Sequence, residues 1–317
     1  MSAGTLLIKV AARRREALDI DSFELASLDG SALPPFSAGA HIDVEVAPGL
    51  VRQYSLCNDP SERHRYQIAV LRDPDSRGGS RAVHERFHPG ATIGISAPKN
   101  HFALLPAPRY LLLAGGIGVT PILCMAERLA REGAEFTMHY CARGPERVAF
   151  LDRIGRPHLV SRVHVHFDAG GPLDLAAMVR EAGADAHLYV CGPAGFIEAC
   201  VAAARAQGWD DSRIHFEYFA APAAATAGDQ AFEIRLASSG RLLTVPADRT
   251  ALEVLFEHGI DIPVSCEQGV CGTCVTRVLG GVPEHRDHFL TDEEHAANDQ
   301  FTPCCSRARG GTLTLDL

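Results

Sequence analysis

The chain lacks the long apolar segments that would carry it into a membrane. No run of about eighteen apolar residues occurs, and residues 1–9 lack a signal-peptide core before the charged run at 13–15. It also lacks a basic excess, because the formal net charge of its 317 residues is −9, which gives no support to nucleic-acid binding. We therefore expect neither a membrane nor a nucleic-acid partner.

The first 200 residues lack the paired cysteine spacing of a disulfide framework. Five cysteines are scattered through them: Cys57, Cys124, Cys141, Cys191 and Cys200. Secreted domains stapled by disulfides show regular cysteine pairs, so this scatter argues against secretion. Reduced thiols predict a cytoplasmic protein.

The C-terminal cysteines, in contrast, have a regular spacing. Cys266-x4-Cys271-x2-Cys274 is followed after 29 residues by Cys304, and this matches the ligand set of a plant-type 2Fe-2S cluster. Glycines in the loop let the backbone curl so that amide N–H groups point at sulfur. Cys305 is adjacent to Cys304; the spacing favours Cys304 as the ligand and leaves the role of Cys305 open. Structural zinc is the alternative, but zinc ribbons usually supply two Cys-x2-Cys pairs.

Histidine is plentiful, but its spacing predicts no metal site. Among the fifteen histidines, His139, His164, His166 and His187 lie on expected strands without a cysteine or carboxylate that completes a ligand set. We interpret them as exposed or hydrogen-bonded side chains.

The apolar pattern divides the chain into three domains and a linker. Residues 1–106 read as short strands between Gly, Pro and Asp turns, which predicts an antiparallel β-barrel. Strands and helices alternate over 107–220, which predicts a parallel α/β sheet. Residues 221–229 have no periodic apolar face and are expected to be a linker, and 230–317 form the cluster domain.

Two glycine turns in the middle domain have the parts of a dinucleotide site. The apolar run 110–114 leads into Gly115-Gly116-Ile117-Gly118-Val119-Thr120-Pro121 and then a helix, so free N–H groups at the helix start can bind a pyrophosphate. Residues 189–196 repeat the arrangement around Cys191, Gly192 and Pro193. An ordinary βα turn explains either one alone, but two such turns can line one cleft.

The first domain holds two segments suited to a second nucleotide. Arg52, Gln53, Tyr54 and Ser55 place a cation, an aromatic ring and a hydroxyl along one expected strand. The run from Arg77 to Arg81 supplies backbone donors, a hydroxyl and two guanidinium groups, which suit a phosphate. The alternatives are a plain barrel strand and a solvated loop.

In combination these motifs resemble a known family. The chain is similar, over essentially its whole length, to phthalate dioxygenase and vanillate O-demethylase reductases of the ferredoxin-NADP reductase superfamily. The resemblance is carried by Arg52-x-Tyr54-Ser55-Leu56, Gly78-Gly79-Ser80, residues 115–121, Cys191-Gly192-Pro193, residues 215–219 and the C-terminal cysteines. It implies an FMN-binding barrel, an NADH-binding α/β domain and a β-grasp-like ferredoxin domain. A cluster placed last favours FMN over the FAD of relatives whose ferredoxin comes first.

The resemblance also implies roles for individual residues. The flavin would be held by Arg52, Gln53, Tyr54, Ser55, Ala69, Val70, Leu71, Gly79, Ser80, Arg81 and Phe219. The dinucleotide would be held by Gly115, Gly116, Gly118, Thr120, Arg143, Asp168, Cys191, Gly192 and Pro193. Ser55, Thr120, Cys191 and Glu217 would surround the reacting rings, with Ser55 donating to the flavin and Glu217 either shielding that region or serving structure alone. The Asp168 carboxylate favours NADH by repelling a 2′-phosphate, while Arg143 keeps NADPH possible.

The function expected from all this is electron transfer from NADH, through FMN and the 2Fe-2S cluster, to a terminal Rieske-type oxygenase, acting as a monomer. The flavin is needed because NADH gives two electrons as hydride while the cluster takes one at a time. Two alternatives stay open: a cytochrome P450 or non-aromatic Rieske monooxygenase as acceptor, and an electron-transfer module without NADH turnover. The sequence does not identify the oxygenase or its aromatic substrate.

Overall fold

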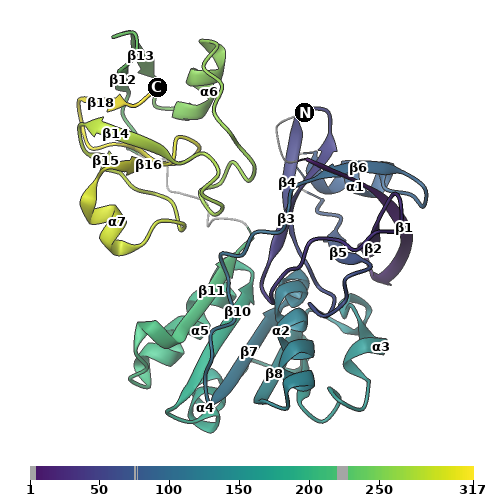
Figure 1. The fold of residues 1–317 in the computed structure, drawn as a ribbon. Helices are drawn as coiled ribbons and strands as arrows, with labels where there is room; N and C mark the ends of the chain where they lie inside the picture. The colour runs from purple at the N-terminus through teal and green to yellow at the C-terminus, as the bar shows by residue number, and fades with distance from the viewer. Residues whose placement is uncertain (1–4, 75, 77, 220–227) are drawn as a thin grey trace. The chain divides into compact units, whose positions relative to one another are not determined.

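The computed structural model describes residues 5–74, 76, 78–219 and 228–317 (Figure 1). These form two compact units, Met1–Phe219 and Ala220–Leu317. Most of the predicted linker at 221–229, and Arg77 of the predicted phosphate loop, lie outside the described residues. None of the helices in the described ranges combines the length and apolar character that crossing a membrane requires.

The first half of unit 1 is a six-stranded antiparallel sheet with one helix, α1 (Gly79–Arg86). The strand order is β4-β3-β6-β1-β2-β5, and the edge strands β4 and β5 also approach each other, which closes the sheet toward a barrel. Apolar and polar residues alternate along β3, so one face of the strand is buried: Ile42, Val44 and Val46 point into the core while Glu45 faces solvent. The strands are β1 (Leu6–Ala17), β2 (Ile20–Ser27), β3 (His41–Ala47), β4 (Leu50–Ser55), β5 (Tyr66–Leu71) and β6 (Thr92–Ile95).

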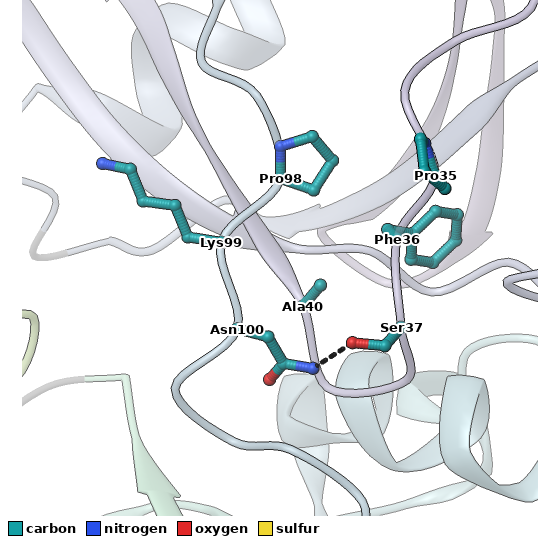
Figure 2. A pocket seen from close by; sticks show the side chains of 7 residues that line it. All are labelled: Pro35, Phe36, Ser37, Ala40, Pro98, Lys99 and Asn100. Atoms are coloured by element: carbon teal, nitrogen blue, oxygen red, sulfur yellow. Dashed lines mark hydrogen bonds between the residues drawn. The ribbon is translucent and has the colours of Figure 1, made fainter.

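A hollow of about 300 Å³ opens on the barrel between two of its loops (Figure 2). Its lining residues are Pro35, Phe36, Ser37, Ala40, Pro98, Lys99 and Asn100. Asn100 Nδ2 donates to Ser37 Oγ at 2.7 Å, and Lys99 Nζ lies 2.6 Å from an Asp43 carboxylate oxygen. None of the residues that the sequence predicts for cofactor binding lines this hollow, so the candidate site is elsewhere.

The second half of unit 1 is a five-stranded parallel sheet in the order β11-β10-β7-β8-β9. Its central strand is the apolar run predicted at 110–114, and Leu111, Leu112 and Leu113 are buried as expected for a strand covered on both faces. The strands are β7 (Arg109–Gly115), β8 (Glu135–Ala142), β9 (Val163–Phe167), β10 (Ala186–Gly192) and β11 (Ile214–Tyr218).

Helices cover the two faces of this sheet. Leu112 packs with α2 on one face, while Leu111 and Leu113 pack with Val179 of α4 and Ile197 of α5 on the other. The helix α2 ends where Gly133 adopts a left-handed conformation. The helices are α2 (Val119–Glu132), α3 (Leu151–Ile154), α4 (Leu175–Ala182) and α5 (Ala194–Ala206), with 3-10 turns η1 (Gly116–Gly118), η2 (Pro145–Arg147), η3 (Asp168–Gly170) and η4 (Asp211–Arg213).

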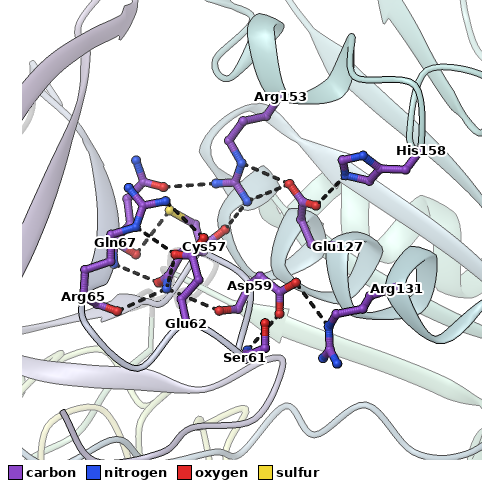
Figure 3. A network of polar contacts seen from close by, with 11 residues as sticks. Cys57, Asp59, Ser61, Glu62, Arg65, Gln67, Glu127, Arg131, Arg153 and His158 are labelled. Atoms are coloured by element: carbon purple, nitrogen blue, oxygen red, sulfur yellow. Dashed lines mark hydrogen bonds and ion pairs between the residues drawn. The ribbon is translucent and has the colours of Figure 1, made fainter. Parts of the chain in front are cut away.

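Buried polar contacts fix the barrel against the parallel sheet (Figure 3). Arg153 of α3 donates to the Cys57 carbonyl at 2.8 Å and to Gln67 Oε1 at 3.1 Å, both in the barrel. The same guanidinium lies 3.2 Å from Glu127 of α2, and the two side chains are only 13% and 8% exposed. Because a buried ion pair tolerates little displacement, this network holds the two halves of unit 1 in one arrangement.

Unit 2 is a mixed sheet in the order β13-β12-β18-β14-β16, with α6 packed against it and a small β15–β17 pair beside it. Phe232, Ile234, Leu255 and Phe301 lie in its core. Both helices begin with a capping box, Thr250 with Glu253 and Thr291 with Glu294. The elements are β12 (Phe232–Leu236), β13 (Leu242–Val245), α6 (Ala251–Glu257), β14 (Thr276–Gly280), β15 (Pro283–Glu284), α7 (Asp292–Ala297), β16 (Gln300–Phe301), β17 (Arg307–Ala308) and β18 (Thr312–Leu315).

Candidate functional site

The two predicted glycine turns lie directly against each other. They end the neighbouring strands β7 and β10, where Ala114 stands opposite Cys191. A Cβ placed on Gly118 would lie 2.3 Å from the Cys191 carbonyl oxygen, and one on Gly192 would lie 2.9 Å from the Gly115 Cα. Only glycine permits so close an approach of two backbones. The turns therefore form one structure.

This structure occupies the topological switch point of the sheet. From β7 the chain adds β8 and β9 on one side, and then β10 and β11 on the other. Ligands of open α/β sheets bind at the carboxyl ends of the strands where the order reverses in this way. The position matches the predicted dinucleotide cleft.

The other predicted dinucleotide residues follow the same carboxyl edge. Arg143 comes directly after β8 and Asp168 directly after β9, and both are exposed. Thr120 is buried in the first turn of α2, where its Oγ1 donates to the Ile117 carbonyl at 3.1 Å. Pro193 immediately precedes α5. An exposed cation and an exposed carboxylate at neighbouring strand ends suit the phosphate and ribose groups of a dinucleotide.

Glu217 joins the barrel to this edge of the parallel sheet. It stands opposite Cys191 in the β10–β11 register and accepts a hydrogen bond from Ser55, the last residue of β4. Its Oε2 atom is sealed from solvent and has no hydrogen-bond partner among the described residues. Three of the four residues predicted around the reacting rings therefore meet, and the fourth, Thr120, lies two residues beyond the Gly118 contact.

Burial dominates the chemistry of this junction. Desolvation raises the pKa of Glu217 to about 8 from an ordinary 4.5, although the Ser55 hydrogen bond opposes the shift. Burial and the nearby Glu217 carboxyl also raise the pKa of the Cys191 thiol. At neutral pH the junction is therefore a neutral surface that carries a hydroxyl, a carboxylic acid and a thiol. A protonated carboxyl can donate as well as accept, which suits the polar edge of a flavin ring.

The barrel also gathers its predicted phosphate residues. The Arg52 side chain lies across Gly79, where a Cβ would be 2.8 Å from Arg52 Cγ. Gly79 begins α1 after a left-handed Gly78, so the helix offers free N–H groups beside Ser80 and the exposed Arg81. A guanidinium over a helix start fits the terminal phosphate of FMN, and this cradle stays on the barrel, outside the dinucleotide cleft.

The remaining barrel residues have varied surroundings. Gln53 donates to Asp43 Oδ1 at 2.9 Å, so its side chain already serves the sheet. Burial raises the pKa of Tyr54, which keeps its phenol neutral. The strand β5, which carries Ala69, Val70 and Leu71, contacts the η1 glycine turn. Phe219 follows β11 directly and is 37% exposed, as an aromatic that shields a removable ring would be.

In unit 2 the structure brings the four predicted cluster thiols together. Cys274 Sγ lies 3.3 Å from Cys304 Sγ, and the Cys266 thiol contacts those of Cys271 and Cys304. The Gln268 amide donates to Cys266 Sγ at 3.3 Å, as expected of a loop that points N–H groups at sulfur. Four convergent thiols fit a 2Fe-2S cluster, and by donor chemistry alone they also fit zinc.

The Cys305 thiol contacts the Cys304 thiol, whereas Cys304 also contacts the thiols of Cys266 and Cys274. The Cys305 Sγ lies 3.4 Å from Thr302 Oγ1 and 3.8 Å from Ser306 Oγ. It also packs beneath Gly269, where a Cβ would come within 2.4 Å of the sulfur. The geometry favours Cys304 as the ligand and gives Cys305 a packing role under the cluster loop.

Sequence reasoning missed two residues that shape this loop. A Cβ on Gly272 would lie 2.2 Å from the Phe289 ring, so Phe289 covers the loop closely. Asp287 is buried beside Gly269 and accepts from Thr302 Oγ1 at 3.2 Å. Both lie in the run 285–295, between Cys274 and Cys304. Only its mixture of apolar and charged residues could have drawn attention to it.

Comparison with known proteins resolves the choice of metal. A family model described as a 2Fe-2S iron-sulfur cluster binding domain matches residues 234–309. A vanillate O-demethylase oxidoreductase of Pseudomonas putida is 56% identical over 312 residues, which cover 97% of this chain and 98% of the relative.

Several solved structures are similar over 99% of this chain, and two of them are informative here. The first is phthalate dioxygenase reductase, described as a modular structure for electron transfer from pyridine nucleotides to 2Fe-2S. It is 39% identical with a TM-score of 0.78, and the match covers 98% of its chain. The second, at 39% identity and TM-score 0.83, is an intact type IV self-sufficient cytochrome P450 monooxygenase, of which the match covers 41%. These likenesses confirm the predicted fold class and family resemblance, and the family model confirms a 2Fe-2S domain.

Proposed function

Because this chain belongs to the phthalate dioxygenase reductase family, we propose that it passes electrons from NADH, through FMN and its 2Fe-2S cluster, to a terminal oxygenase. The observation that carries the proposal is the sealed junction of Ser55, Cys191 and Glu217. It places the end of a barrel strand against the switch point of the parallel sheet within one compact unit. A ring bound on the barrel and a nicotinamide bound at the switch point would meet there.

The residues divide between the two nucleotides. Arg52, Gly79, Ser80 and Arg81 would hold the FMN phosphate, with Gln53, Tyr54, Ser55, Ala69, Val70, Leu71 and Phe219 around the ring. Gly115, Gly116, Gly118, Thr120, Arg143, Cys191, Gly192 and Pro193 would hold NADH, and the exposed Asp168 would disfavour the 2′-phosphate of NADPH. FMN, when bound, supplies uptake of a hydride and release of single electrons, which no side chain can perform. Cys266, Cys271, Cys274 and Cys304 would hold the cluster.

The protein's own contribution is to hold and dry the junction. With the ring bound, Ser55 would orient it by donating its single hydroxyl proton to the ring in place of Glu217, and neutral Glu217 would keep charge away from the approaching hydride. The buried Cys191 would exclude water beneath the nicotinamide.

We propose that the acceptor is an oxygenase for a methoxylated aromatic acid, since the relative with 56% identity is a vanillate O-demethylase oxidoreductase. A cytochrome P450 is the second candidate, because a self-sufficient P450 includes a similar region in its own chain. All ten cysteines are free, which supports a cytoplasmic location, and we expect a monomer because each cofactor site lies within one chain. We further propose domain boundaries at 1–106, 107–220 and 230–317, with a linker at 221–229.

The decisive experiment is anaerobic addition of NADH to the purified holoprotein. We expect bleaching of the flavin absorbance followed by reduction of the iron–sulfur signal in electron paramagnetic resonance. Flavin that stays oxidised while dithionite still reduces the cluster would leave only an electron-transfer module. Product formation with vanillate-type oxygenase compared with a P450 would then decide between the acceptors.

A further inference from the structure

A second group of ligating side chains lies in unit 2, outside the cysteine site. It consists of His285, just after β15, Asp287 in the following loop and His295 in α7. Their ligand atoms all lie within 4.8 Å of one another. His295 Nε2 is 3.3 Å from Asp287 Oδ2, and His285 Nδ1 is 3.7 Å from Asp287 Oδ1.

The group is buried and only partly satisfied. The side chains of His285 and Asp287 are 8% and 0% exposed, while that of His295 is 27% exposed. The His285 ring stacks on His295 at 4.4 Å, and its nitrogens have only long contacts with the side chains of Asn298 and Asp287, which fall outside ordinary hydrogen-bond geometry. Burying polar atoms without good hydrogen bonds is unfavourable, so an ion that binds these nitrogens would stabilise the fold.

The Asp287 carboxylate is held in a fixed orientation between the two rings. Its Oδ2 accepts from the amides of Leu290 at 2.8 Å and Phe289 at 3.3 Å. Its Oδ1 accepts from Thr302 Oγ1 at 3.2 Å. Metal sites commonly contain ligands oriented by such outer hydrogen bonds, and the arrangement leaves Oδ1 directed toward His285.

We propose that His285, Asp287 and His295 bind a divalent transition-metal ion, for which zinc is the best match. Two imidazoles and a carboxylate are ligands that zinc favours, and its bonds of about 2.0–2.2 Å in a tetrahedron set donor atoms about 3.4 Å apart. The two imidazole nitrogens lie 3.3 and 3.7 Å from the two different oxygens of Asp287, which is close to that spacing for a carboxylate that binds the ion through both oxygens. Rotation of the less buried His295 closes the third edge, and a water molecule supplies the fourth ligand.

The metal would steady the loop that holds the cluster. A Cβ on Gly269, between Cys266 and Cys271, would lie 3.0 Å from the Asp287 Cα. The next residue, His288, donates its amide to the Gly269 carbonyl at 2.9 Å. An ion that fixes Asp287 therefore resists movement of the cluster loop without touching a cysteine.

Equilibrium dialysis of the holoprotein tests this proposal independently of NADH turnover. The protein is first dialysed against EDTA, then against micromolar zinc, and zinc and iron are both measured by mass spectrometry. We expect one zinc per chain with iron fully retained, and a higher thermal midpoint when zinc is present. His295→Gln should weaken zinc binding by more than the roughly tenfold to hundredfold that losing an outer-shell partner costs. His258→Gln, an exposed histidine after α6, is the matched control and should bind zinc like the wild type.

Three results would overturn the proposal. The wild type could take up no zinc, His295→Gln could keep the wild-type affinity, or zinc uptake could be matched by loss of iron, which would place it at the cysteines. His285→Asn gives a second measurement and should also lose zinc. If that buried substitution prevents folding, the partly exposed His295→Gln decides the question alone.

Discussion

Replacing Glu217 with glutamine removes an ionisable group of β11 whose carboxyl is buried against the end of β4. Burial raises the pKa of this carboxyl to about 8, against 4.5 in an exposed setting, even though Ser55 donates a hydrogen bond to it. Glutamine keeps the size and the acceptor for Ser55 but cannot ionise. The substitution therefore isolates the electrostatic part of the junction.

The sign and size of the effect follow from the two pKa values. Below about pH 4.5 both the folded and the unfolded chain hold the proton, so Glu217 does not oppose folding. Between pH 4.5 and 8 only the folded chain keeps it, and stability falls by about 1.4 kcal/mol for each pH unit. Above pH 8 the loss is complete and amounts to at most about 5 kcal/mol. Glu217→Gln lacks this loss.

The assay compares thermal midpoints of the wild type and Glu217→Gln across pH 5 to 9, a range of about four units around the shifted pKa. We expect the midpoint of the wild type to fall relative to that of Glu217→Gln as pH rises toward 8, by roughly 2–4 °C for each kcal/mol. Glu198→Gln, the same change at an exposed position of α5, should follow the wild type. The rate of flavin bleaching by NADH, measured in parallel, should show a pH dependence near 8 that Glu217→Gln loses.

Parallel pH profiles for the wild type and Glu217→Gln would refute the reasoning. They would mean that Glu217 ionises near its ordinary pKa and that water reaches the junction. A pH dependence that Glu198→Gln loses as fully as Glu217→Gln does would assign the effect to general surface charge.

Three further predictions concern contacts that hold the sites together. Gly118→Ala drives a Cβ against the Cys191 backbone, so it should lower the free energy of unfolding by about 1–3 kcal/mol and raise the KM for NADH. Gly195→Ala is the control: its Cβ would meet nothing within 4 Å, so neither quantity should change. Arg153→Leu leaves the buried Glu127 carboxylate with His158 as its one basic neighbour among the described contacts and should destabilise unit 1 by up to about 3–5 kcal/mol in denaturant unfolding. Cys304→Ser should lose the visible circular dichroism of the cluster, whereas Cys305→Ser should keep it.

Each of these predictions has a contradicting outcome. Equal KM values for the two alanine variants would remove the argument for close backbone approach. A loss in Arg153→Leu no larger than that in Arg131→Ala, whose exposed pair with Asp59 is worth about 1 kcal/mol or less, would show that the network does not hold the barrel. Cluster loss in Cys305→Ser alone would exchange the roles of the two cysteines.

Local patterns in the sequence predicted most of this architecture. The apolar run at 110–114 became β7 because a strand covered on both faces must be apolar throughout. The glycine turns were visible because close backbone approach admits no other residue, and the cluster thiols because their spacing is fixed by the metal's geometry. Apart from Cys304, which follows Cys274 after 29 residues, these signals depend on neighbours within about ten residues along the chain.

What the sequence could not reveal depends on contacts between distant segments. The family resemblance, and no local pattern, set Glu217 and Ser55 around the reacting rings. In the structure they meet because the barrel docks on the sheet, where Arg153 reaches Cys57 and Gln67. No periodicity marks any of these residues. His285 and His295 escaped for the same reason, since α7 must turn back before their rings can stack.

The order of the strands explains why a costly buried carboxyl lies at this junction. Placing β10 and β11 together on one side of β7 sets Cys191 opposite Glu217 at the switch point, the position at which open α/β sheets bind their ligands. The barrel then covers that position with Ser55 and excludes water from one side. A carboxyl confined there can satisfy its second oxygen only through whatever binds beside it. A bound ring that reached the unpaired Oε2 of Glu217 would account for a carboxyl at this position, where packing alone would favour an apolar residue.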